Sequence, residues 1–365
     1  MEKLKHKLFS VMKSYTKEQF VKDVIAGIIV AIIALPLSIA LALASGVTPE
    51  KGIYTAITAG FVISFLGGSR VQIAGPTAAF ATIVAGIVAK NGIDGLIIAT
   101  LLAGVILILM GFLRLGNLIK FIPYTITTGF TSGIAVTIFI GQIKDFLGLT
   151  IVSEEPLIET MDKLKAVFQF ISTTNLQALL VGVISLLILI VWQYLPGFCK
   201  KIPPSLIAVL VGSAMVALLN MNVNTIGDLY EISNKLPTIS LPSFSLKTVQ
   251  NVLPDAFTIA ILAAIESLLS CVVADSMVNS RHRSNMELIA QGAGNITSAL
   301  FGGIPATGAI ARTAANVKKR RTYSHCRYGT FCDTAVNTGG ADALCGTDPH
   351  AYHRSNPVHG GIQYV

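Results

Sequence analysis

The chain has 365 residues, of which 53% are hydrophobic and 13% are charged, and its formal net charge is +8 at pH 7. Its mean hydropathy is +0.69. Soluble domains carry about twice this share of charged residues, so the composition excludes that class and predicts a membrane protein.

The N-terminal segment, residues 1–22, is basic. A basic leader before a first membrane span sets orientation, so we expect a cytoplasmic amphipathic helix and no nucleic-acid partner. The first apolar run, residues 24–44, is long enough to span and is followed by further apolar runs instead of a cleavage site. We therefore expect no cleavable signal.

Ten apolar segments follow one another along the chain. They cover residues 24–44, 53–67, 76–89, 94–113, 121–141, 176–195, 204–220, 256–277, 285–300 and 305–317. The third and the tenth are too short to cross a bilayer. With the N-terminus inside, the loops predicted to be cytoplasmic contain Arg70, Arg114, Lys120, Lys200, Lys201, Arg281 and Arg283. This bias supports that orientation.

The two short segments are preceded by similar sequences. FLGGSRVQIAGPTAAFA covers residues 65–81 and LFGGIPATGAIARTAAN covers residues 300–316. Each contains Gly-Gly, an extended piece, and Pro beside a small residue at a predicted helix start. Paired breaks of this kind indicate an inverted-repeat transporter with its substrate between opposed half-helix N-termini, which attract anions. The alternative is that Gly and Pro only mark kinked or re-entrant helices.

Motifs of other chemistries are missing from the sequence. There is no phosphate-binding Gly loop with Lys, no nucleophile beside a base, and no His/Cys spacing for a metal in the helical region. We therefore expect neither an enzyme nor an ATP-driven pump, and we expect no resident metal.

Two stretches resemble the sulfate permease (SulP) family of anion transporters. The first is LPLSIALALASGVTPEKGIY, residues 35–54, and the second is the long run from Ala263 to Asn316. The resemblance extends over residues 20–317. It implies an all-α polytopic membrane domain of fourteen segments, built as two inverted repeats of seven, followed by a cytoplasmic STAS domain.

The resemblance also implies how the segments divide. A moving core would contain residues 23–120 (segments 1–4) and 256–317 (segments 8–10), and a gate would contain residues 121–220 (segments 5–7). Residues 221–255 would form an extracytoplasmic loop. The core would carry the anion past the gate in an elevator-like motion.

By position, the family's anion site would lie between the third and tenth segments. The implied substrate contacts are Gly75, Thr77, Ala78, Ala306, Thr307 and Gly308, with Leu37 and Leu41 as a wall and Arg312 as a source of positive potential. An intramembrane Arg usually has a functional setting, although pairing with a neighbouring carbonyl or acid is an open alternative.

A coupling site is expected at Glu266 and Ser270, which are four residues apart and share a helix face. Sodium-coupled members of the family place an acid and a hydroxyl here, and Gly308 could add a carbonyl. Ile310 stands where those members have another hydroxyl, so coupling to a proton through Glu266 competes with coupling to Na⁺. A structural Glu266–Arg312 ion pair is the plain alternative.

The resemblance stops after Val317. Residues 318–365 are basic and polar, and they include Cys326, Cys332 and Cys345. One extra adenine in the codons for Lys318 and Lys319 would permit Lys-Asn-Gly-Gly-Arg-Thr-Pro-Ile-Ala-Gly, the family's continuation. The shifted codons for residues 331–343 can all encode apolar residues. We therefore interpret the tail as an out-of-frame product, which truncates the fold after about ten segments and removes the STAS domain.

The sequence thus predicts a secondary transporter for sulfate, bicarbonate or a dicarboxylate, working by symport or anion exchange in a bacterial inner membrane. The truncated chain itself is expected to be inactive, and the homodimer typical of the family is doubtful without the STAS domain. The alternative is a membrane protein that does not transport and whose Cys/His-rich tail binds a metal or a partner.

Overall fold

The structure is a computed structural model that describes residues 16–117, 124–152, 159–192, 194–195, 202, 204–223, 225, 237–239, 242 and 245–317. The chain divides into two units, residues 1–317 and 318–365. The second unit lies outside the described residues, and so does most of the basic leader. Neither the interpretation of the tail nor the amphipathic leader is therefore tested here.

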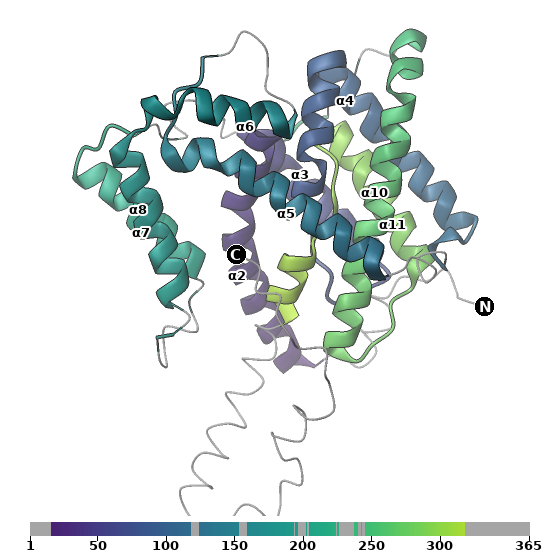
Figure 1. Ribbon diagram of the computed structural model, residues 1–365. Helices are drawn as coiled ribbons and strands as arrows, with labels where there is room; N and C mark the ends of the chain where they lie inside the picture. The colour runs from purple at the N-terminus through teal and green to yellow at the C-terminus, as the bar shows by residue number, and fades with distance from the viewer. Residues whose placement is uncertain are drawn as a thin grey trace, which may run out of the picture. The chain divides into compact units, whose positions relative to one another are not determined.

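The described part of the chain is almost entirely helical (Figure 1). The α-helices are α2 (Lys17–Ala44), α3 (Pro49–Leu66), α4 (Ala81–Phe112), α5 (Tyr124–Leu147), α6 (Thr160–Gln169), α7 (Leu176–Trp192), α8 (Pro204–Leu218), α10 (Leu246–Val278) and α11 (Ser284–Leu300). Residues 310–317 are also helical. The short elements are η1 (Ala78–Phe80), η3 (Ile171–Thr173), β1 (Ala74–Gly75) and β2 (Thr307–Gly308).

Three of the described helical stretches are long and apolar enough to cross a membrane: Lys17–Ala44, Ala78–Phe112 and Leu246–Val278. The first begins at a capping box, in which Thr16 and Gln19 satisfy each other's backbone N–H groups. It starts seven residues before the predicted span, inside the basic leader. Similarly, α10 begins ten residues before the predicted eighth segment, inside the predicted loop 221–255.

The stretch from Ala78 to Phe112 contains the predicted third and fourth segments. They are separated at Gly92, which has a φ of 69° and a ψ of −172°. This backbone conformation is readily available only to glycine, so the chain breaks the helix here without a loop. Two predicted segments therefore appear as one broken helix.

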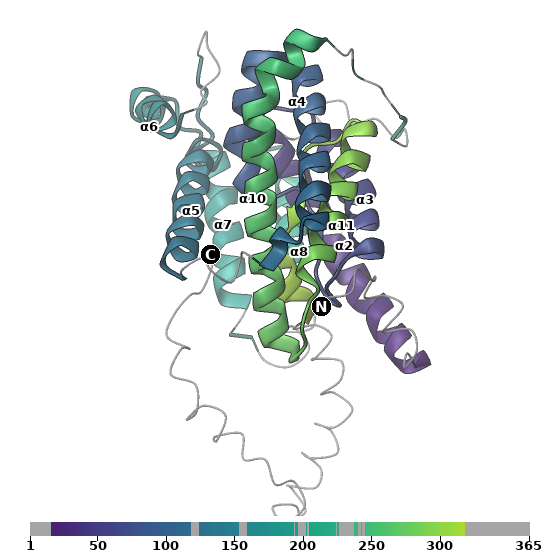
Figure 2. The ribbon, with the colours of Figure 1, turned by 90° about the vertical axis from the view of Figure 1, so that its right-hand side faces the viewer.

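The most closely packed part of the fold is formed by α3, α4, α10 and α11, and Figure 2 shows α4, α10 and α11 side by side. Small residues let α4 and α11 cross closely: a Cβ added to Gly104 would lie 2.7 Å from the carbonyl oxygen of Gly292. Membrane helices associate mainly through this kind of close backbone packing, since lipid offers no hydrophobic driving force between helices.

Replacing Gly104 with Val is expected to destabilise the protein by about 1–3 kcal/mol, because the new side chain meets backbone that cannot move aside. Gly86→Val on the same helix is the control, since a Cβ there meets nothing within 4 Å. The thermal midpoint of each purified variant in detergent should fall for Gly104→Val and stay near the parent for Gly86→Val. Equal midpoints for the two variants would argue against this helix crossing.

A second group of helices contains α5, α7 and α8, with the short α6 between α5 and α7 (Figure 1). These helices correspond in sequence to the predicted gate segments 5–7. The sequence did not predict α6.

The two short breaks meet as an antiparallel pair of strands. Ala74 pairs with Gly308, and Gly75 pairs with Thr307. The helices after the breaks begin later than predicted: η1 starts two residues after Pro76, and the tenth-segment helix starts five residues after Pro305. The reason is that residues expected to open each helix are extended and pair with the opposite break.

Candidate functional site

The strand pair holds the starts of two half-helices together. Beyond the paired residues, the Ala309 N–H donates to the Ile73 carbonyl oxygen at 2.9 Å. The Ile73 N–H in turn donates to the Thr313 hydroxyl at 3.0 Å. These bonds hold the two breaks to each other and fix the start of the helix that follows each one.

The second break is also fastened to α11. The Asn295 side chain accepts from the Ala306 N–H at 2.9 Å and donates to the Ala306 carbonyl oxygen at 2.8 Å. One turn further on, the Ser298 hydroxyl donates to the Ile304 carbonyl oxygen at 2.7 Å. From α3, the Thr55 hydroxyl accepts from the Ile304 N–H at 2.7 Å. The extended piece before β2 is therefore clamped on two sides.

The same face of α11 holds the connection that leads to the first break. Glu287 is 1% exposed, and its carboxylate accepts from the Gly68 N–H at 2.8 Å and from the Gln291 side-chain amide at 2.9 Å. Glu287, Gln291, Asn295 and Ser298 recur every three or four residues, so they form one buried polar stripe along the helix. We call these four residues the α11 polar stripe, and it is the scaffold of both breaks.

Arg312 is the charged residue at the centre of this arrangement. Its side chain is 4% exposed. One guanidinium nitrogen, Nη2, donates to the Ser38 hydroxyl and to the Pro76 carbonyl oxygen, both at 3.3 Å. A Cβ on Gly75 would lie 2.6 Å from Nη1, so a larger residue there would require the guanidinium to shift.

The partners of Arg312 are all neutral. Its Nε is buried and has no hydrogen-bond partner among the described residues. Two ion pairs in the described ranges join Lys165 to Asp162 and His282 to Asp275, and neither involves Arg312. The Glu266–Arg312 pair considered as an alternative is therefore not formed. A buried guanidinium without a counter-charge is costly, so the site favours an anion.

Glu266 faces the first break. Its carboxylate accepts a hydrogen bond from the Thr77 hydroxyl at 3.0 Å. Ser270, expected on the same face, donates instead to the Thr313 hydroxyl at 3.4 Å. Gly308 is packed against Gln72, whose side chain donates to the Ser267 carbonyl oxygen at 3.2 Å, so a side chain at position 308 has no space.

The residues expected to contact substrate differ in whether their hydrogen-bond donors are already bonded within the protein. The Ala306 N–H donates to the Asn295 side-chain oxygen, and the Thr307 hydroxyl donates to the Ala263 carbonyl oxygen at 3.1 Å. Ala78 and Ala79 open η1, so their N–H groups have no acceptor within the helix, and no other described group accepts from them. The first N–H groups of the helix at residues 310–317 also have no acceptor within the helix, so both breaks offer free backbone donors.

The wall expected from α2 is also different in detail. Leu37 is 40% exposed, whereas Ser38 beside it is fully buried and contacts Arg312. Leu41 is partly buried. Sequence reasoning missed Ser38 and Asn295. The regular spacing of polar residues in residues 287–298 was a signal that could have found Asn295.

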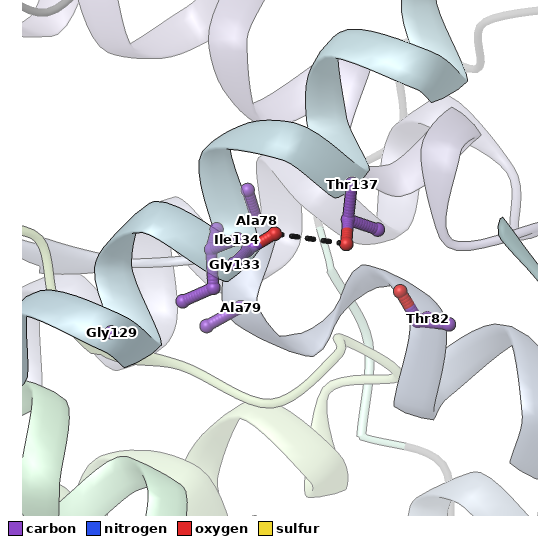
Figure 3. Close-up of a pocket in the computed structure, with 7 residues that line it drawn as sticks. All are labelled: Ala78, Ala79, Thr82, Gly129, Gly133, Ile134 and Thr137. Atoms are coloured by element: carbon purple, nitrogen blue, oxygen red, sulfur yellow. Dashed lines mark hydrogen bonds between the residues drawn. The ribbon is translucent and has the colours of Figure 1, made fainter. Parts of the chain in front are cut away.

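A cavity of about 330 Å³ lies beside the free donors of η1. Figure 3 shows its two sides: Ala78, Ala79 and Thr82 from the third segment, and Gly129, Gly133, Ile134 and Thr137 from α5. A Cβ on Gly129 or Gly133 would meet nothing within 4 Å, so these glycines leave space open instead of allowing close packing. The Thr137 hydroxyl donates to the Gly133 carbonyl oxygen at 3.0 Å. The residues that line the cavity are uncharged, and most of them have small side chains.

Within the described ranges, no group of three or more His, Cys, Asp or Glu residues is placed to hold a metal ion. The cysteines considered for a zinc module, Cys326, Cys332 and Cys345, lie outside those ranges. The zinc alternative therefore stays a prediction.

Comparison with known proteins gives a family match over most of the chain. The pattern described as the Sulfate permease family matches residues 20–320. The putative sulfate transporter YvdB of Bacillus subtilis is 45% identical over 308 residues, which are 84% of this chain and 57% of the relative. The bicarbonate transporter BicA of a Picosynechococcus strain is 34% identical over 309 residues, covering 81% of this chain and 53% of the relative. The chain spans about half the length of these curated relatives.

Solved structures agree with the fold. The transmembrane domain of a cyanobacterial bicarbonate transporter, BicA, superposes with a TM-score of 0.71 at 30% identity, over 84% of this chain and 78% of that domain. SLC26A9 superposes with a TM-score of 0.74 at 20% identity, over 86% of this chain and 53% of that protein, and this likeness bears on the fold alone. The predicted all-α polytopic membrane fold is confirmed.

Proposed function

Because the chain belongs to the sulfate permease family, we propose that it is the N-terminal part of a secondary active transporter for a small anion. Its relatives are named as sulfate and bicarbonate transporters, and these two anions, with dicarboxylates, are the candidate substrates. The chain is a multi-pass membrane protein and not an enzyme. We propose the bacterial inner membrane, with the N-terminus in the cytoplasm, as its location.

The setting of Arg312 carries the proposal. A full positive charge is buried between α2 and the two breaks, and its described partners are a hydroxyl and a carbonyl oxygen. An anion bound beside it would supply the missing counter-charge and a hydrogen-bond acceptor for the buried Nε. A structural arginine would be expected to have a carboxylate partner.

The first break supplies the second part of the proposed site. The N–H groups of Ala78 and Ala79, which have no acceptor among the described residues, lie at the positive end of the helix that continues into α4. The cavity against α5 borders these donors and is large enough for a small hydrated anion, since a water takes about 30 Å³ in the liquid. We propose that the anion reaches the N–H groups from this cavity.

Coupling is proposed to involve Glu266. Its carboxylate has one described partner, Thr77, which belongs to the same break as the free N–H groups. A change in the charge of Glu266 would therefore be felt directly at the anion site. Ser270 is turned to Thr313, and Ile310 offers no hydroxyl, so few oxygen ligands are left for Na⁺. Proton symport, sodium symport and exchange are distinguished by uptake driven by a pH gradient, a Na⁺ gradient or a trans anion.

We also propose that residues 318–365 are translated out of frame and that the chain as written transports little. The family match ends at residue 320, and the curated relatives are almost twice as long as the matched part. Among the described residues, α5, α7 and α8 correspond to the predicted gate segments 5–7, and we propose that transport needs the second half of the gate as well.

The anion site can be tested on the purified chain by ligand-dependent thermal stability. Sulfate, bicarbonate and succinate are added below about 5 mM, where general salt exclusion contributes little, with matched ionic strength set by sodium gluconate. We expect one of the three small anions to raise the thermal midpoint more than the other two and more than gluconate, and the rise should grow with the logarithm of its concentration above the dissociation constant. Identical shifts with all salts would count against an anion site.

A further inference from the structure

The helix α6 is different from its neighbours. It has ten residues, Thr160–Gln169, and lies between the end of α5 and the start of α7. In Figure 1 it runs across the direction of α7, and in Figure 2, a quarter turn away, it is seen along its own axis. It therefore lies across the direction of α7, in the connection between α5 and α7.

One side of α6 packs against the protein. Ala166 and Val167 are each 6% exposed, and the helix contacts α5. Thr160 and Lys163 are partly buried as well. The other six residues are exposed or partly exposed and divide into two sets of three. The apolar set is Met161, Leu164 and Phe168, and the polar set is Asp162, Lys165 and Gln169.

The two sets have the same internal spacing, offset by one residue. Residues three and seven positions apart lie on one helix face, and an offset of one residue turns the face by about 100°. The exposed surface of α6 therefore has an apolar strip and, beside it, a polar strip. This is the pattern of a helix that lies at a boundary between an apolar and an aqueous medium.

Exposure and charge support this assignment. Met161 is 60% exposed, Phe168 is 69% exposed and Leu164 is partly buried, so most of the apolar strip is left uncovered by the described residues. On the polar strip, Lys165 pairs with Asp162 at 3.3 Å, with side chains 75% and 46% exposed. An exposed pair of this kind is favourable in water and costly in hydrocarbon. Ile171, just after the helix, is 53% exposed and extends the apolar surface.

We propose that α6 lies in the lipid interface, with the apolar strip in contact with acyl chains near the headgroups and the polar strip in water. The partner that covers the apolar strip is the lipid bilayer, because the chain is a membrane protein and the polar strip beside the apolar one must remain hydrated. The helix would hold the junction of α5 and α7 at a fixed depth. This inference depends on the membrane setting and not on the identity of the transported anion.

The test uses tryptophan fluorescence with depth-dependent quenching. The chain has one Trp, Trp192, which is replaced by Phe, and a single new Trp is placed on each strip: Phe168→Trp or Gln169→Trp. The two variants are reconstituted in phosphatidylcholine–phosphatidylglycerol nanodiscs, with or without lipids brominated near the carboxyl end of the acyl chain. These neighbouring positions are matched controls for each other.

We expect the Trp at position 168 to emit at shorter wavelength and to lose roughly half its intensity in brominated lipid, as for a side chain buried about 5–10 Å in the interface. The Trp at position 169 should be quenched mainly by aqueous iodide. Equal iodide quenching at both positions would overturn the proposal. Protection of position 168 from both quenchers would also overturn it, because protein would then cover the apolar strip.

Folding of the variants is checked by their elution profile and thermal midpoint. If Trp192→Phe alone disturbs the fold, Trp192 is retained and its emission is subtracted, because position 192 is common to both variants. The measurement needs no transport activity, so failure of the proposed anion site would leave its result unchanged.

Discussion

Replacing Arg312 with Gln is expected to lower anion affinity at least tenfold. A hydrogen bond between charged groups contributes about 1.5–3 kcal/mol, and every 1.4 kcal/mol corresponds to a factor of ten in the dissociation constant. Arg312→Lys keeps the charge but cannot reproduce the forked donors, so we expect an intermediate loss. The affinity is measured by equilibrium binding of radiolabelled sulfate, bicarbonate or succinate to purified protein.

The same variant separates a binding role from a structural role. In the absence of anion, Arg312 is a buried charge with neutral partners, so Arg312→Gln should leave the thermal midpoint unchanged or raise it. A structural arginine would lower the midpoint with or without anion. The control is Arg70→Gln, since Arg70 is exposed and should affect neither quantity. Unchanged anion binding by Arg312→Gln would contradict the proposed site.

Restoring the reading frame after Val317 is the second change with a large expected effect. We expect the 365-residue chain in proteoliposomes to take up no more labelled anion than empty liposomes. A chain continued in the second frame, with the family's remaining segments, should take up anion many times above this background. The physical reason is that movement of a core past a gate requires both halves of the gate.

Two results would argue against this view of the tail. Anion uptake by the purified 365-residue chain would show that the described helices suffice. A closed second frame in the DNA after codon 317, together with one zinc bound per chain, would favour the alternative of a tail that binds metal. Reading the DNA across codons 316–323 is the simplest control, because it requires no protein.

The part of the fold that sequence could predict is the part written in local patterns. Apolar runs marked the helices, and the repeated Gly-Gly and Pro pattern marked two breaks in corresponding places. Gly92 separates the third and fourth segments by a single residue with positive φ, so the sequence pattern gave two segments where the chain forms one broken helix.

The remaining features depend on contacts that a local pattern does not specify. The hydrogen bond of Thr55 to Ile304 joins residues 249 positions apart, and that of Arg312 to Ser38 joins residues 274 positions apart. No sequence pattern around Ser38 indicates that its hydroxyl contacts Arg312. The helix α6 was missed for another reason: a search for long apolar runs overlooks ten residues whose apolar positions alternate with charged ones.

The hydrogen bonds of the second break limit which of its predicted site residues have donors available for substrate. Ala306 and Thr307 were expected to contact substrate, but their N–H and hydroxyl groups are bonded to Asn295 and Ala263. These residues therefore shape the second break, while Ala78 and Arg312 keep donors available. The second break thus contributes the side chain of Arg312 and the free N–H groups at the start of the helix at residues 310–317.

The position of the bound anion is the most direct test of this account. A density map of the frame-restored protein would be determined with the anion that gives the largest thermal shift. We expect anion density within hydrogen-bond distance of both the Arg312 guanidinium and the Ala78 N–H. Anion density elsewhere, with Arg312 still bonded only to Ser38 and Pro76, would contradict it.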